Sequence, residues 1–409
     1  MEIMANLTVL SLDKFRGLVG DKTIEKIYDS ASTLSEKSAV HVNSTYQGGG
    51  VAEILNSLII LMNDAGIKTD WRVIHGSHDF FSVTKKFHNA IQGERIHLTE
   101  LKKKTYYITN VNNAIFTHLN HDFVIVHDPQ PLPIITCYKK RQPWIWRCHI
   151  DISEPMKELW DYLKMFIVKY DAMVVSMNKF RERNLPDHII PQFIIRPSIN
   201  PLNIKNDVIP ESAISRYMQK MGIVTEKPII SQVSRFDKWK DPKGMVKIFR
   251  LIKKKLDCQL VLMGSMATDD PEGQEIFEQV ERAVGDDKDI HLIMNAPDIA
   301  VNALQRSSNV VIQRSLKEGF AITVSEALWK SKPVVASNVG GIPSQVLDNK
   351  NGYLLDPMDL QGFADRIIHL IKHPELSKKM GENGKEHVRN NFLITRHLLD
   401  YINLLKKVD

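Results

Sequence analysis

The segment Arg314-Ser315-Leu316-Lys317-Glu318-Gly319-Phe320-Ala321-Ile322-Thr323-Val324-Ser325-Glu326 follows a short apolar run at residues 310–312. This pattern predicts a buried strand, then a loop, then a helix that begins near Ile322. Gly319 allows the backbone to approach a ligand closely, and the first N–H groups of a helix suit a phosphate. Two carboxylates beside an anion site need another role, and they can accept hydrogen bonds from vicinal sugar hydroxyls. The segment therefore predicts a site for a sugar joined to a diphosphate.

Short apolar runs alternate with amphipathic helical patterns on both sides of this segment. Because the runs are apolar throughout and helices separate them, each series predicts a parallel sheet buried on both faces. We expect strands of the first series at 39–43, 71–74, 123–127, 145–148 and 172–176, with helices at 51–65, 84–92, 105–119 and 156–170. We expect strands of the second series at 229–233, 260–263, 291–293, 310–312, 334–336 and 353–355, with helices at 244–255, 274–284, 299–307, 323–330 and 360–371.

The length of 409 residues favours two domains over one. Residues 194–210 contain three prolines and little periodicity, which is typical of an interdomain linker. The sequence predicts a first domain over 1–197 and a second over 198–390, both α/β units. A last helix is expected within 391–409, and one or two helices within the first 35 residues should pack outside the first sheet.

The bulk composition argues against several classes of protein. The net charge of +6 is spread in short basic triplets along the chain, which favours solvated helix ends over nucleic-acid binding and also suits an anionic nucleotide. Three cysteines without CxxC spacing argue against a disulfide framework or a zinc site and for a reducing compartment. No signal peptide and no apolar run of about 18 residues is evident, so we expect a soluble cytoplasmic protein without membrane contact.

Glu318 and Glu326, seven residues apart with Gly-Phe after the first, resemble the EX7E signature of retaining glycosyltransferases of family GT4. The resemblance implies the GT-B fold, two Rossmann-like domains facing across a cleft, and nucleotide-diphosphate sugars used without a metal or other cofactor. It implies that Glu318 contacts the donor sugar and Glu326 the nucleotide ribose, with Gly319, Phe320, Ala321 and Ile322 around the donor. Many members have Gly where this chain has Ala321. The resemblance also implies that the last helix packs back on the first domain.

A glycine-rich loop, Thr45-Tyr46-Gln47-Gly48-Gly49-Gly50, follows the first expected strand and precedes a helix. Three glycines there favour ligand approach over a plain turn, which would need only one. The segments 41–45 and 48–53 resemble the opening of one GT4 branch, the trehalose synthases and retaining trehalose phosphorylases. Gly49 and Gly50 are candidates for donor contact, and Gly48 and Glu53 for acceptor contact. Glu53 could instead serve only to favour the helix start.

Two further strand ends carry polar residues where ligands of open α/β sheets collect. Asp128 and Gln130, in His-Asp-Pro-Gln-Pro, suit acceptor-sugar hydroxyls, although a turn capped by the aspartate explains them equally well. His149, in Trp-Arg-Cys-His-Ile-Asp, matches the histidine that GT4 enzymes place against the transferring sugar. A buried structural histidine is its alternative interpretation.

The segment 234–242 resembles the GT4 loop whose Arg and Lys face the donor diphosphate. Arg235 and Lys240 would then stabilise charge on the leaving group, as a metal ion does elsewhere. Met294 and Asn295 follow the third strand of the second series, where GT-B enzymes receive the nucleotide base. The alternative for Arg235 and Lys240 is that they are ordinary solvated charges on a loop.

The resemblance covers nearly the whole chain and implies transfer of a glucosyl group from ADP-, UDP- or GDP-glucose to glucose, giving trehalose. One rival is a retaining trehalose phosphorylase that uses inorganic phosphate at the same anion site. Another is a non-catalytic sugar-nucleotide binding protein on the same fold. A Rossmann dehydrogenase is disfavoured because no GxGxxG with a later acidic residue occurs. The expected partners are a nucleotide sugar and a sugar acceptor, and assembly as a homodimer stays open.

Overall fold

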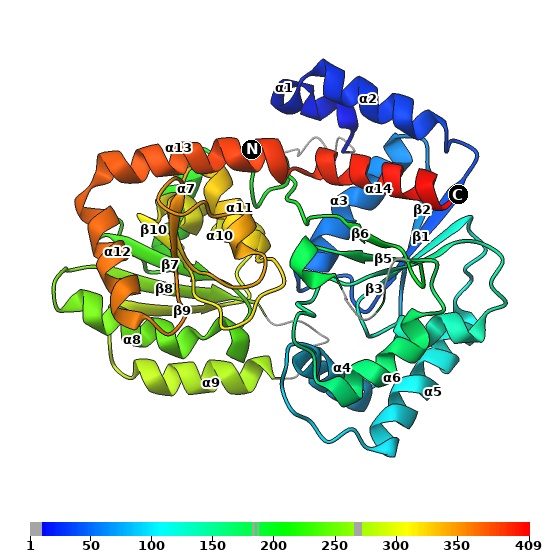
Figure 1. Ribbon diagram of the computed structural model, residues 1–409. Helices are drawn as coiled ribbons and strands as arrows, with labels where there is room; N and C mark the ends of the chain where they lie inside the picture. Colours follow the sequence, from blue (N-terminus) through cyan, green and yellow to red (C-terminus); the bar gives the residue numbers. More distant parts are fainter. Residues whose placement is uncertain (1–9, 182–184, 186–187, 266–271) are drawn as a thin grey trace.

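The computed structural model describes residues 10–181, 185, 188–265 and 272–409. It contains two lobes, each built on a six-stranded parallel sheet with helices on both faces (Figure 1). The predicted GT-B architecture is therefore confirmed. The first sheet has the order β2 (Lys68–Val73), β1 (Ser38–Asn43), β3 (Phe123–His127), β4 (Trp144–Arg147), β5 (Ala172–Val175) and β6 (Gln192–Ile194). The second has the order β12 (Gly352–Leu355), β11 (Val334–Ser337), β10 (Val310–Gln313), β7 (Ile229–Val233), β8 (Gln259–Gly264) and β9 (Ile290–Met294).

Helices cover both faces of each sheet and bury its apolar residues. The N-terminal lobe has α1 (Arg16–Val19), α2 (Asp21–Ser32), α3 (Gly50–Asp64), α4 (His78–Ile91), α5 (Glu100–Phe116) and α6 (Lys157–Ile167). The C-terminal lobe has α7 (Glu211–Lys220), α8 (Pro242–Lys253), α9 (Gly273–Val284), α10 (Asp298–Ser307), α11 (Ile322–Trp329), α12 (Leu360–Lys372) and α13 (Pro374–Asn391). Among the described residues, no helix is both long and apolar enough to cross a bilayer.

Several elements differ from the sequence-based expectation. Helices α4 and α5 begin five or six residues earlier than predicted, because Ser77 and Thr99 cap them by accepting from the N–H groups of Phe80 and Lys102. Strand β6 and helices α7 and α13 were not predicted. Helix α13 was missed because it has few apolar residues, and α7 because it directly follows the Pro-rich linker.

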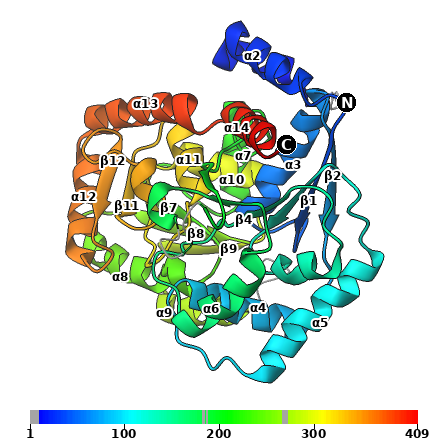
Figure 2. The ribbon, with the colours of Figure 1, turned by 45° about the vertical axis from the view of Figure 1, so that its right-hand side comes forward.

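The last helix, α14 (Ile394–Val408), crosses from the C-terminal lobe and lies on the N-terminal one (Figures 1 and 2). Its buried hydrophobic residues recur at helical spacing and join the core formed with α2 and α3; they are Ile394, Leu398, Tyr401, Ile402, Leu404 and Leu405. The chain crosses between the lobes at two adjacent points. There Ile199 N donates to Phe392 O at 2.8 Å, and Ile394 N donates to Ile199 O at 2.9 Å.

Candidate active site

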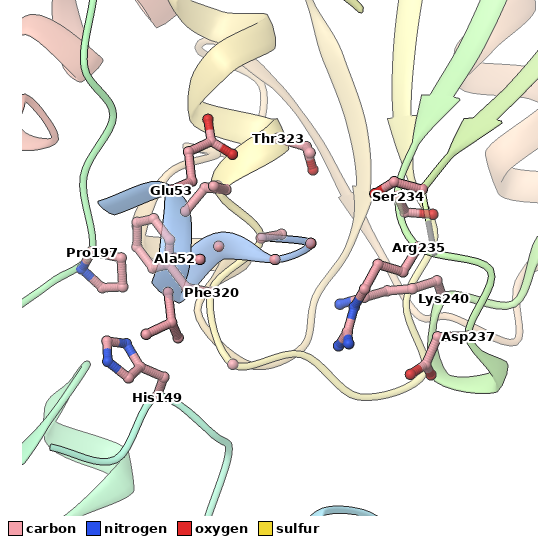
Figure 3. Close-up of a pocket in the computed structure, with 18 of the residues that line it drawn as sticks. Ala52, Glu53, His149, Pro197, Ser234, Arg235, Asp237, Lys240, Phe320 and Thr323 are labelled. Carbon is pink, nitrogen blue, oxygen red and sulfur yellow. The ribbon is translucent and has the colours of Figure 1, made fainter. Parts of the chain in front are cut away.

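A cavity of about 330 Å³ lies between the two lobes. Its walls come from the loops that follow strands β1, β3 and β4 on one side and β7, β8 and β10 on the other. These loops meet because the carboxyl ends of both parallel sheets are directed toward the same gap, which is where open α/β sheets bind ligands. Figure 3 shows Arg235 and Lys240 opposite His149, Phe320 and Pro197 across this space.

The C-terminal lobe supplies a basic wall. Arg235 follows β7, and Lys240 ends a short 3-10 turn at Lys238–Lys240. Lys240 Nζ forms an ion pair with Glu318 Oε2, so two residues predicted to face the donor are in direct contact. Glu318 also accepts a hydrogen bond from Ser315 Oγ at 3.1 Å. The loops after β7 and β10 therefore fix each other's charged groups at the cavity.

Asp237 connects this basic wall to the opposite lobe, and sequence reasoning missed it. Its Oδ2 lies 2.7 Å from Lys85 Nζ on α4, and both side chains are buried. Burial favours the neutral acid, but Lys85 and Arg235 outweigh it and hold the pKa of Asp237 well below its usual range. Trp239 Nε1 donates to Asn89 Oδ1 at 3.1 Å beside this pair. Lys85 and Asn89 gave no signal in the sequence because they lie on an ordinary amphipathic helix.

The loop after β10 depends on close backbone approach. A Cβ atom on Gly319 would overlap His149 O of the other lobe, and one on Gly340 would overlap Glu318 O. Ala321 has φ 66°, a left-handed conformation that costs an L-residue about 1 kcal/mol and that glycine adopts freely. The backbone at this position therefore has a conformation that glycine adopts freely, even though alanine occupies it.

Two helix N-termini face the cavity together. Helix α3 begins at Gly50, after Gly48 and Gly49, and α11 begins at Ile322, and all four residues line the wall. The two ends are adjacent, since a Cβ atom on Gly50 would lie 3.4 Å from Ile322 Cδ1. Unpaired N–H groups at both ends carry partial positive charge, which favours an anion between them.

Glu53, Lys205 and Glu326 form an ion cluster next to these helix ends. Lys205 Nζ lies 2.7 Å from Glu53 Oε2 and 3.4 Å from Glu326 Oε1. Glu53 and Lys205 line the cavity, whereas Glu326 is fully buried behind them. Burial, and then the charge of Glu326, raise the pKa of Glu53 to about 7. Sequence reasoning missed Lys205, because it lies in the Pro-rich linker without any periodic pattern.

Asp128, Gln130 and His149 all line the N-terminal side of the cavity. Asp128 has φ 61° and accepts a hydrogen bond from His149 N at 2.7 Å. The Asp128 carboxylate thus accepts from the loop after β4, and Asp128 also lines the cavity. The wall near β9 is formed by Ala296 and Asp298, and it does not include Met294 or Asn295 among the described residues.

Comparisons with known proteins identify the family of the chain. A family described as trehalose synthase, N-terminal domain, matches residues 41–182, and glycosyl transferases group 1 matches residues 214–387. The trehalose synthase of Thermococcus litoralis is 45% identical over 96% of this chain and 96% of its own. The trehalose phosphorylase of Pleurotus pulmonarius is 28% identical over 92% of this chain but only 58% of its own.

The fold is shared with solved structures of low sequence identity. A UDP-forming α,α-trehalose-phosphate synthase from Burkholderia xenovorans superposes with a TM-score of 0.72 at 15% identity, covering 91% of this chain and 99% of that one. At such identity the likeness concerns the fold alone. The match at 45% identity over 96% of both chains, by contrast, shows the family of the chain. This chain belongs to the trehalose synthase family of glycosyltransferases.

Proposed function

We propose that the protein is a retaining glycosyltransferase that transfers the glucosyl group of a nucleotide-diphosphate glucose to free glucose, giving trehalose. One observation carries the proposal. A single cavity combines paired helix N-termini and a basic wall, which suit a diphosphate, with acidic and amide side chains that suit sugar hydroxyls. The trehalose synthase of Thermococcus litoralis, aligned along nearly the whole chain, supports trehalose as the product.

Each predicted residue then has a defined task. Arg235 and Lys240 bind the diphosphate and stabilise the charge that develops as it leaves. Glu318 orients the glucosyl hydroxyls while it is itself held by Lys240 and Ser315. His149, Asp128 and Gln130 line the opposite wall and meet the two sugars.

Glu326 binds the nucleotide ribose. Its carboxylate is buried behind Glu53 and Lys205 and contacts the Lys205 ammonium at 3.4 Å, so these two side chains must move aside before a ribose reaches it. The ribose hydroxyls then donate to the carboxylate in place of the ammonium.

The reaction proceeds by attack on the face of the sugar that the diphosphate leaves. The bond from the anomeric carbon to the phosphate oxygen breaks, the bond to the acceptor oxygen forms on the same side, and the acceptor proton passes to the departing phosphate. The protein contributes positioning and fixed charge, and closure of the two lobes around the donor keeps water from it.

Incubation of the purified protein with ADP-, UDP- or GDP-glucose and labelled glucose tests the proposal. We expect a labelled disaccharide that a trehalase specific for the α,α isomer cleaves, and no product with Lys240→Ala. A parallel reaction with trehalose and inorganic phosphate examines the phosphorylase alternative, in which glucose 1-phosphate would appear instead. Binding of a nucleotide sugar without any turnover would identify a non-catalytic binding protein and contradict the proposal.

A further inference from the structure

Three histidines form a continuous chain of hydrogen bonds that begins at the cavity and ends in the protein core. His149 Nε2 lies 2.9 Å from His127 Nδ1, and His127 Nε2 lies 2.9 Å from His41 Nδ1. The rings stack at centroid distances of 5.3 and 5.1 Å. His41 is buried away from the cavity, whereas His127, although buried, lines the cavity together with His149.

Strand register explains how these residues come together. His41 on β1 pairs with Ile125 on β3, and His127 follows Ile125 by two residues, so both side chains are on one face of the sheet. His127 pairs in turn with Arg147 on β4, and His149 lies two residues beyond it. Helix α14 covers this face, where buried Arg147 of β4 and His397 of α14 lie near the histidines among apolar side chains. Polar residues in such a place require a reason.

All three imidazoles are neutral at ordinary pH. Burial lowers the pKa of His41 to about 3 and that of His127 and His149 well below its usual range. A neutral imidazole carries one N–H and one bare nitrogen, so each ring that donates on one side must accept on the other. The chain therefore has only two states, and the proton position on His41 determines which nitrogen of His149 is protonated.

The buried end favours one of these states. His41 Nε2 has no hydrogen-bond partner within the described part of the chain. A buried N–H group without an acceptor is rarer in proteins than an acceptor without a donor, so the unpartnered Nε2 is the bare nitrogen of the ring. His41 then carries its proton on Nδ1.

We propose that His127 and His41 are positioning residues that hold His149 in the Nδ1–H tautomer, so that His149 is a hydrogen-bond donor to a sugar oxygen in the cavity. His41 Nδ1–H donates to His127 Nε2, and His127 Nδ1–H donates to His149 Nε2. His149 keeps its own proton on Nδ1, the nitrogen not engaged by His127. A free imidazole side chain populates both neutral tautomers. The hydrogen-bonded chain of His41, His127 and His149, which we call the relay, leaves only one tautomer of His149 populated before the sugar binds. The catalytic consequence rests on the proposed function, whereas the tautomer itself does not.

Nitrogen NMR on protein labelled with 15N-histidine tests the relay without any substrate. Two-bond proton–nitrogen spectra assign each ring nitrogen as protonated or bare, and the loss of signals in His149→Asn identifies the His149 ring. We expect a single His149 species with the proton on Nδ1. In His127→Leu we expect the Nε2–H form to appear and kcat to fall about tenfold, the loss of one hydrogen bond. His41→Asn keeps an amide where Nδ1 was, so it should retain the wild-type His149 signal and most of the activity.

His121→Asn is the matched control, because His121 pairs with Asp70 on the outer side of the same lobe. It should leave the His149 signals and kcat unchanged. A wild-type His149 with its proton on Nε2, or His149 signals unaffected by His127→Leu in a folded variant, would overturn the relay. If His127→Leu does not fold, the wild-type and His41→Asn spectra still decide. A protein that turns over no nucleotide sugar but shows the Nδ1–H signal would contradict only the proposed function.

Discussion

Lys205 Nζ lies 2.7 Å from Glu53 Oε2, so an ammonium from the interdomain linker is bound by a carboxylate of the N-terminal lobe. The same ammonium lies 3.4 Å from Glu326 in the C-terminal lobe. Three parts of the chain that are distant in sequence therefore meet at one charge cluster beside the cavity. A change in the relative position of the lobes must alter this cluster.

Lys205→Met should destabilise the protein and weaken donor binding. The substitution leaves two carboxylates close together without the cation between them, and loss of one partner of a largely buried pair costs about 3 kcal/mol. Urea unfolding at pH 7 measures the stability, and calorimetry with a nucleotide sugar measures the affinity. Lys205→Arg keeps the charge and should lose less in both measurements. Wild-type stability and affinity in Lys205→Met would show that the cluster has no role.

Glu53 should make stability depend on pH between about 4.5 and 7. Its pKa is raised to about 7 in the folded protein, against 4.5 as the ordinary value, so the folded state binds the proton more tightly. This contribution is complete below the unfolded pKa and is lost as pH rises through the folded one. Because 26% of the side chain is exposed, we expect about 2 kcal/mol over this range. Unfolding free energies at several pH values should show this slope in the wild type and a flatter one in Glu53→Gln.

Lys85→Met should loosen the contact between the lobes. Lys85 and Asp237 form a buried ion pair across the cleft, and removal of one partner leaves a buried charge at a cost of about 3–5 kcal/mol in the closed state. The closed state would lose population to an open one, so small-angle X-ray scattering should give a larger radius of gyration and the KM for the donor should rise. Asp237→Asn with Lys85→Met should recover part of the loss. An unchanged scattering curve in Lys85→Met would show that the Lys85–Asp237 pair does not hold the two lobes together.

Arg235→Ala should lower kcat/KM by about 10²–10³, the usual effect of removing one group that stabilises a developing oxyanion. Arg235→Lys should restore part of the activity, because it keeps the charge but not the planar guanidinium. Lys243→Ala is the matched control, since Lys243 is a nearby exposed cation that bonds to Gln279 on the surface. Steady-state kinetics with the best donor compares the three. Equal losses in Arg235→Ala and Lys243→Ala would indicate a general effect of net charge.

The sequence was sufficient for the fold and for most of the cavity wall, because parallel strands and their carboxyl ends follow from local patterns. Glu318, Arg235 and Lys240 were identified because each follows an apolar strand and matches a family motif. The residues that orient them were not. Lys85 contacts Asp237, which lies 152 positions later in the chain. Lys205 contacts Glu326, which lies 121 positions later. Nothing in a short window of sequence predicts such contacts.

The histidine chain is a second example of contacts that the sequence does not predict. His127 ends one expected strand and His41 lies within another, yet no motif joins them to His149. The link depends on the register between β1, β3 and β4, which only the structure supplies. Gly340 is similar, because no motif in the sequence singles it out, yet a Cβ atom there would overlap the backbone oxygen of Glu318.

Gly340→Ala should impair catalysis more than folding. Gly340 has φ 54°, and a Cβ atom there would overlap Glu318 O, so an alanine must displace the loop that carries Glu318. The left-handed backbone alone costs an alanine about 1 kcal/mol, whereas misplacement of a group that orients the sugar can lower kcat about 10²-fold. Gly17→Ala is the control, because nothing lies within 4 Å of its added Cβ atom and its φ is not positive. Thermal unfolding and kcat measured together separate the two effects. A Gly340→Ala variant with wild-type kcat would mean that the loop tolerates the shift and that Glu318 does not need this close contact.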